Sequence, residues 1–104
     1  MNAVTRNERK ALARAVLEID VCNHPGVMSH VVGLFSRRAC NLEGILVMPV
    51  GNGERSRMWL MVNEDQRLSQ MVKQVEKLED VLAVRRHGAD HAVFERLEEF
   101  FHAE

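Results

Sequence analysis

Residues 14–22 read RAVLEIDVC and form the first element of the predicted fold. Polar side chains alternate with apolar ones, so that Glu18 and Asp20 fall on one face. The apolar set falls on the other face: Ala15, Leu17, Ile19 and Val21. Such alternation predicts a strand with one face in the core and the other in water.

A turn into a helix follows this strand, because NHPG occupies residues 23–26. Asn23 or His24 can cap the helix, and Pro25 suits its first position, where a missing N–H costs nothing. Between Val27 and Cys40 apolar residues recur with helical spacing. They are Met28, Val31, Val32, Phe35 and Ala39.

The next segment predicts a hairpin. Asn41 can adopt the left-handed conformation that ends the preceding helix. Residues 42–50, LEGILVMPV, predict a strand, and Pro49 indicates an edge position or a bulge because it cannot donate to a ladder. The Asn-Gly pair within residues 51–53 favours a tight turn, and residues 55–62 return as a strand.

The second half adds a helix, a strand and a short terminal helix. After a turn at residues 63–66, apolar residues with helical spacing predict the helix: Leu68, Met71, Val72, Val75 and Leu78. Residues 80–87 predict a fourth strand, and residues 91–102 a terminal helix. The order predicts a ferredoxin-like α+β fold, with both longer helices on one face of a four-stranded antiparallel sheet. Trp59 and Met61 are large enough to cover the opposite face.

Composition narrows the class of protein. The 104 residues are 46% hydrophobic and 28% charged, with a net charge of −1, which fits one domain. The balance of charge excludes the strongly basic surface of a nucleic-acid binder. Because we find neither an apolar run long enough to span a membrane nor a leader peptide, we expect a cytoplasmic protein without membrane partners. We divide the chain into a basic extension (1–13), a domain (14–88) and a helical tail (89–104).

The residues that usually carry chemistry do not form a recognisable set. About 1.5 Å of rise per residue puts Cys22 and Cys40 roughly 20 Å apart across the helix, which excludes a disulfide or a shared metal ion. The histidines lack metal-ligand spacing, and the serines lie in no nucleophile motif. We therefore assign no catalytic or metal-binding residue, which argues against an enzyme in its own right and against a metal carrier.

One segment has the features of an anion site. Cys22–Met28, CNHPGVM, joins a strand end to the first turn of a helix, whose free N–H groups and dipole favour negative charge. Gly26 leaves room for close approach to the backbone. A plain capped turn explains the same residues, so both interpretations stay open on this segment alone.

Longer stretches carry a family resemblance. NHPGVMSHVVGLFSRRACNLEGILVMPV (residues 23–50) and WLMVNEDQRLSQMVKQVEKLEDVLAVRRH (residues 59–87) closely resemble the regulatory small subunits of acetolactate synthase (acetohydroxyacid synthase). The similarity is greatest to the short, single-domain form that isozyme I has. HPGVM, GLFSRRACNLEGI and the run from DQRL to KLEDV are the most specific pieces, and the similarity covers residues 15–101.

The resemblance implies an ACT domain in a non-catalytic chain without a cofactor of its own. It implies a large catalytic partner that carries thiamine diphosphate, Mg²⁺ and FAD and condenses pyruvate with pyruvate or 2-oxobutyrate. In this family the small subunit activates the catalytic subunit and confers feedback inhibition by valine in branched-chain amino acid biosynthesis, the route to isoleucine and valine. A freestanding ACT amino-acid sensor that serves another enzyme or regulator is the alternative.

The resemblance also implies an effector site. Asn23 and Gly26 match the turn that holds the amino acid, and Asn41 matches a contact from the neighbouring subunit. Since Asn23 and Asn41 lie at opposite ends of a helix, we expect a homodimer, paired antiparallel along residues 42–50, to bring them together. We expect the N–H groups of residues 26–28 to meet the valine carboxylate. The full set of expected effector-binding residues is Asn23, His24, Gly26, Val27, Met28, Asn41 and Leu42.

Overall fold

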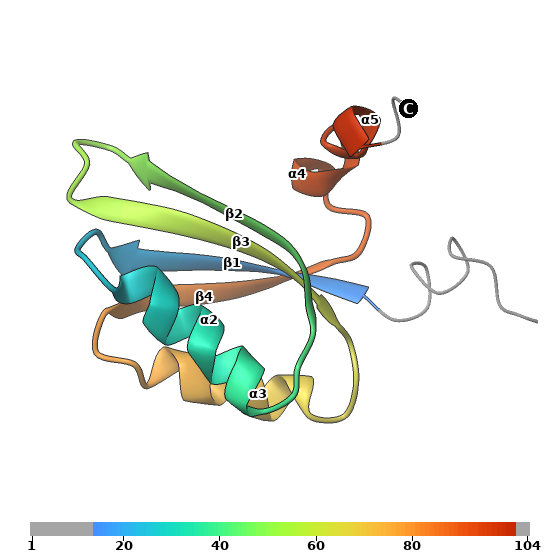
Figure 1. The fold of residues 1–104 in the computed structure, drawn as a ribbon, viewed down its shortest axis with the longest axis horizontal. Helices are drawn as coiled ribbons and strands as arrows, with labels where there is room; N and C mark the ends of the chain where they lie inside the picture. The colour runs from blue at the N-terminus through green and yellow to red at the C-terminus, as the bar shows by residue number, and fades with distance from the viewer. Residues whose placement is uncertain (1–13, 102–104) are drawn as a thin grey trace, which may run out of the picture.

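The computed structural model describes residues 14–101 and has the predicted order of elements (Figure 1). They are β1 (Arg14–Cys22), α2 (Val27–Arg37), β2 (Leu42–Val50), β3 (Arg55–Asn63), α3 (Leu68–Glu76), β4 (Val81–Gly88), α4 (Ala92–Glu95) and α5 (Glu98–Phe101). The sheet order is β2-β3-β1-β4, and all neighbouring strands are antiparallel. The ferredoxin-like α+β fold is therefore confirmed. The expected extension over residues 1–13 lies outside the described residues.

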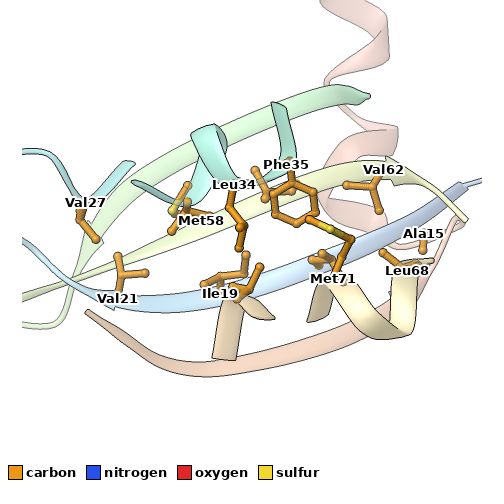
Figure 2. Packing of buried hydrophobic residues seen from close by; sticks show 14 residues of the cluster. Ala15, Ile19, Val21, Val27, Leu34, Phe35, Met58, Val62, Leu68 and Met71 are labelled. Atoms are coloured by element: carbon orange, nitrogen blue, oxygen red, sulfur yellow. The ribbon is translucent and has the colours of Figure 1, made fainter. Parts of the chain in front are cut away.

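The main core lies between the sheet and the two longer helices. α2 and α3 both pack on the face that carries Leu17 and Ile19 of β1, as Figure 2 shows for several labelled side chains. β3 contributes Met58 and Leu60, which lie directly opposite Ile19 and Leu17 in the antiparallel register. The alternation along residues 14–22 thus places its apolar side chains in the core, as predicted.

The opposite face of the sheet has a smaller apolar cluster beneath the C-terminal segment. Val16, Met61 and Phe94 are its buried members, and the half-buried Trp59 packs against them. Trp59 and Met61 therefore lie on the face where the sequence placed them. The cover is α4, which supplies Phe94 and Val93.

Gly44 of β2 lies under this cover, so a larger side chain there is expected to displace α4. A Cβ added at Gly44 would lie 2.7 Å from Cε1 of Phe94. We expect Gly44→Val to lower the free energy of unfolding by about 1–3 kcal/mol, as overpacking usually does. It should also expose Trp59, the single tryptophan. Urea unfolding and a red shift of tryptophan fluorescence measure the two effects.

The control for this prediction is the same change in a Phe94→Ala background. In that background the ring that the new valine would contact is absent, so Gly44→Val should lower the free energy of unfolding much less than it does in the natural chain. Equal costs in the two backgrounds would contradict the proposed contact.

The expectation that one face of β1 meets water is wrong for Glu18 and Asp20. Both are buried, with 8% and 6% of their surface exposed. The register explains the burial, because Glu18 lies opposite Arg85 of β4 and Asp20 lies opposite Arg57 of β3. Such cross-strand pairs of opposite charge stabilise a sheet.

These charges form one network. Arg85 Nη2 donates to Glu18 Oε2 at 2.7 Å and to Asp20 Oδ2 at 2.6 Å, and Arg57 Nε donates to Asp20 Oδ1 at 2.8 Å. His87 Nε2 lies 2.9 Å from Glu18 Oε1. The hydrogen bond from Arg85, aided by His87, lowers the pKa of Glu18 to about 2 against the opposing effect of burial. For Asp20, burial raises the pKa, but the hydrogen bonds from Arg57 and Arg85 outweigh it and the net shift is downward.

The lowered pKa of Glu18 predicts how stability changes in acid. The network stabilises the fold fully above the ordinary pKa of 4.5 and loses this effect as the pH falls toward about 2. One pKa unit corresponds to about 1.4 kcal/mol, and the half-exposed arginines reduce the expected contribution to about 1–2 kcal/mol. Glu18→Gln should therefore flatten the fall of unfolding free energy across this range, measured by urea titration at each pH.

The exposed Glu76 on α3 supplies the matched control. Glu76→Gln should leave the slope of stability against pH unchanged. If Glu18→Gln also left that slope unchanged, the result would contradict the claim that the arginine network keeps the Glu18 carboxylate ionised.

The ends of the helices differ from the predictions. The N-cap of α2 is Gly26, at φ 87°, rather than Asn23 or His24, and Pro25 precedes the helix. Only glycine adopts this left-handed conformation without strain, which explains the choice of residue. α2 ends at Arg37 rather than Cys40, and the left-handed residue beyond it is Ala39, at φ 56°, rather than Asn41.

The remaining elements agree closely with their predicted ranges. The strands match to within one residue, and α3 ends at Glu76 rather than Leu78. The predicted terminal helix over 91–102 is instead two four-residue helices, the first capped by His91, whose Nδ1 accepts from Val93 N. No helix among residues 14–101 is long and apolar enough to cross a membrane.

Candidate effector-binding site

The turn between β1 and α2 is fixed to the β2–β3 turn through Asn23. Its side-chain Nδ2 donates to the carbonyl oxygen of Gly53 at 2.8 Å, and its backbone N–H donates to that of Glu54 at 2.9 Å. The side-chain oxygen of Asn23, which these bonds leave unused, lies on an exposed residue. Asn23 therefore offers an acceptor for a cationic group such as an ammonium.

Gly26 makes the start of α2 open to a ligand. Nothing lies within 4 Å of the place that a Cβ would occupy there. Val27 N–H already donates to His24 O at 3.3 Å, so it is a poorer candidate for the anion than expected. Among the described residues, the N–H groups of Met28 and Ser29 have no recorded partner, which makes them the available donors of the first turn. Ser29 is not among the residues expected from the sequence, although it lies in the first turn of the predicted helix.

His24 ties this turn to the connection between α3 and β4. Its Nε2 lies 2.6 Å from Asp80 Oδ1, and its Nδ1 lies 3.0 Å from Pro25 O. The hydrogen bond with Asp80 raises the pKa of His24 above its ordinary value. Since both ring nitrogens face oxygen atoms, the arrangement favours the imidazolium, whose charge is balanced by the Asp80 carboxylate. Asp80 has no sequence signal for this role, because only the fold brings it to His24.

The two apolar residues of the turn differ in exposure. Val27 is 6% exposed and points into the core (Figure 2), whereas Met28 is 48% exposed. Val27 therefore offers a ligand very little surface. Met28 is free to cover one.

Asn41 and Leu42 lie at the other end of α2. The eleven residues of α2 span about 16 Å, which separates Asn41 from Asn23 within one chain. Asn41 is exposed just before β2, and Leu42 is half-buried against the main core. One chain therefore brings together five of the expected effector residues at one end of α2 and two at the other.

The two cysteines lie beside the two ends of the same helix. Cys22 ends β1 and Cys40 follows α2, and both are free and half-buried. Among residues 14–101, no group of three or more His, Cys, Asp or Glu side chains is arranged to hold a metal ion.

Comparison with known proteins decides the family. The family model described as the AHAS small subunit-like ACT domain matches residues 17–83, which include the Gly26 turn and all of α2. This chain belongs to that family of acetohydroxyacid synthase (AHAS) small subunits. The small subunit of acetolactate synthase isozyme 1 from Escherichia coli K12 is 54% identical over 86 residues, which cover 83% of this chain and 90% of that protein.

Longer AHAS small subunits match over part of their length. The isozyme 3 small subunit of the same E. coli strain is 40% identical over 76 residues, or 72% of this chain and 47% of that protein. The crystal structure of the acetolactate synthase small subunit from Thermotoga maritima superposes with a TM-score of 0.64 at 35% identity. It matches 70% of this chain and 46% of its own. The ACT domain of a GTP pyrophosphokinase from Chlorobium tepidum, at 19% identity and a TM-score of 0.60, shares the fold.

Proposed function

We propose that this chain is the regulatory subunit of an acetolactate synthase, and that it binds valine at a site shared by two copies of the chain. The observation that carries the proposal is the open turn at Gly26, with the free N–H groups of Met28 and Ser29, in a chain that is 54% identical to the isozyme 1 small subunit. A helix start with free N–H groups suits a carboxylate, which every amino acid has.

Valine fits this turn in one orientation. Its carboxylate accepts from Met28 and Ser29 N–H, near the imidazolium of His24. Its ammonium donates to the side-chain oxygen of Asn23 and to that of Asn41 from the second chain. Its branched side chain rests against Met28 and the second chain's Leu42. Because one methylene in such a pocket changes affinity by about 1–3 kcal/mol, leucine and isoleucine bind more weakly but still bind.

The free edge of β2 supports the shared site. Among the described residues, β2 is an edge strand of the sheet, so its outer side can pair with the β2 strand of a second copy of the chain. Two-fold antiparallel pairing sets the start of each β2, with Asn41, beside the end of the other. That end leads into the β2–β3 turn, to which Asn23 is bonded at 2.8 Å. The homodimer thus forms two equivalent sites.

Regulation follows from a difference in affinity. Valine inhibits only if it binds one conformation of the complex more tightly than another. The catalytic subunit, in the cytoplasm, would hold thiamine diphosphate, Mg²⁺ and FAD and perform the condensation. This chain would activate that subunit without contributing a catalytic group.

Reconstitution tests this function. The full chain is mixed with a purified catalytic acetolactate synthase subunit, and acetolactate formation is measured with and without valine. We expect the chain to raise activity and valine to lower it again. Lack of both association and activation would overturn the proposal and favour a freestanding sensor for another protein.

A further inference from the structure

The side chain of His24 joins the candidate effector turn to the connection between α3 and β4. Its Nε2 lies 2.6 Å from Oδ1 of Asp80, the residue that immediately precedes β4. The backbone makes the same junction, because the N–H of Cys22 donates to the carbonyl oxygen of Asp80 at 2.9 Å. Asp80 is therefore held against the turn by its main chain, and its carboxylate meets His24 without a rearrangement of either segment.

The same ring also holds the peptide group that precedes Gly26. Nδ1 of His24 lies 3.0 Å from the carbonyl oxygen of Pro25. That oxygen belongs to the peptide group that joins Pro25 to Gly26, and Gly26 is the N-cap of α2 with a φ of 87°. Because glycine rotates more freely than any other residue, this bond restrains the backbone that lies before the open N–H groups of Met28 and Ser29.

Both hydrogen bonds of the ring can form at once only when His24 is protonated. A carboxylate and a carbonyl oxygen accept hydrogen bonds and donate none, whereas a neutral imidazole has one N–H and one bare nitrogen. The hydrogen bond with Asp80, followed by that with Pro25, raises the pKa of His24 above its ordinary value of 6.5. On deprotonation, the carboxylate of Asp80 is the stronger acceptor and keeps the remaining N–H, so the bond to Pro25 is the one that is lost.

The other charged groups around His24 do not replace Asp80. Glu79 precedes Asp80 and is exposed, and its carboxylate acts on His24 through charge alone. His30 of α2 faces the other oxygen of Asp80, but its Nδ1 lies 3.9 Å from Oδ2, which is too far for a hydrogen bond. From the β2–β3 turn, Glu54 contacts this loop through its backbone carbonyl oxygen. Among the described residues, Asp80 thus supplies the recorded carboxylate contact of His24.

We propose that Asp80 is a positioning residue of the valine site and that, through His24, it makes the affinity for valine depend on pH. This inference rests on the proposed function, because it takes valine to bind at the Gly26 turn. Below the raised pKa of His24, the imidazolium holds both Asp80 and Pro25, and the turn is ordered for the ligand. As the pH rises through that pKa, the bond to Pro25 is lost and valine binds more weakly.

Calorimetry of the full chain with valine measures this dependence. The loss of one hydrogen bond should raise the dissociation constant about three- to tenfold between about pH 6 and about pH 9. Valine binding within this range should also take up protons, which appears as a difference between the binding heats in buffers of different ionisation enthalpy. In return, saturating valine should raise the titration midpoint of His24, followed by NMR of its ring.

Variants of the α3–β4 connection identify the group responsible. Asp80→Asn keeps an acceptor for His24 but removes the negative charge, so the fall in valine affinity should move to lower pH. Asp80→Glu retains the charge and should keep the fall nearer to its natural position. Glu79→Gln is the matched control, because it changes the adjacent carboxylate, and it should move the fall much less than Asp80→Asn. His24→Gln should remove the proton uptake.

The proposal is overturned if the natural chain binds valine equally well across this range, or if Asp80→Asn weakens binding by the same factor at every pH, as a merely structural role would. Should Asp80→Asn fail to fold by circular dichroism, proton uptake by the natural chain and its loss in His24→Gln decide the matter. Binding that does not depend on pH leaves the valine site standing and removes only the role of Asp80. Absence of valine binding at every pH rejects the valine site itself, and this proposal with it.

Discussion

Replacing Gly26 with aspartate is expected to abolish inhibition by valine while leaving activation of the catalytic subunit intact. The new carboxylate would lie in the open space beside Gly26, next to the N–H groups of Met28 and Ser29. It would repel the valine carboxylate and compete for its donors. Each charge-assisted hydrogen bond is worth about 1.5–3 kcal/mol, so the dissociation constant for valine should rise about 100-fold or more.

Backbone strain must be separated from charge in this experiment. Gly26 has a φ of 87°, and a residue with a side chain pays about 1–2 kcal/mol in the left-handed region. Gly26→Ala introduces the same strain without the carboxylate, so it is the matched control. It should weaken valine binding much less than Gly26→Asp. An unchanged calorimetric affinity for valine in Gly26→Asp would reject the proposed site.

Phe35→Ala is expected to give the largest loss of stability. Phe35 is fully buried, with 0% of its surface exposed, and packs from α2 into the main core (Figure 2). Truncating a buried phenylalanine leaves a cavity and costs about 3–5 kcal/mol. Because small domains are stable by only about 5–15 kcal/mol, the variant should be partly unfolded at moderate temperature. Urea or thermal unfolding followed by circular dichroism measures the change.

Two variants make the result interpretable. Ser36→Ala changes the exposed neighbour of Phe35 and should alter stability very little. Phe35→Leu retains most of the buried volume and should cost less than Phe35→Ala. A cost below about 1 kcal/mol for Phe35→Ala would contradict the packing described for α2.

Local patterns predicted the fold because each element has its own periodicity. Alternation along β1 and helical spacing along α2 and α3 depend on near neighbours, which the sequence displays directly. Glu18 and Asp20 depart from this rule. Their burial depends on Arg57 and Arg85, which reach them from β3 and β4 across the sheet. Alternation cannot reveal such partners, since polar residues in a strand normally face water.

The candidate effector site also combines features that the sequence shows directly with contacts that only the fold creates. The Gly26 turn is visible in the sequence because the Pro-Gly pair and the helix start are contiguous. The bond from Asn23 to Gly53 and the pair of His24 with Asp80 join segments that are remote in sequence. The sequence predicts the left-handed residue after α2 at Asn41, because asparagine adopts that conformation more readily than alanine does. The chain instead places Ala39 there, where the N–H of Cys40 donates to Phe35 O at 2.9 Å.

The shared site makes a prediction that a site within one chain cannot. Gly26→Asp and Asn41→Ala should each abolish valine binding in a pure homodimer, through the turn and through the second-chain contact respectively. When the two variant chains are mixed, every heterodimer regains one intact site, formed by the natural turn of one chain and the natural Asn41 of the other.

The most direct measurement is therefore the stoichiometry of valine binding to this mixture after unfolding and refolding together. With random pairing, about one quarter of the natural number of sites should reappear, with near-natural affinity. Complete absence of binding in a mixture shown to contain heterodimers would contradict a site built from Asn23 and Gly26 of one chain and Asn41 of another.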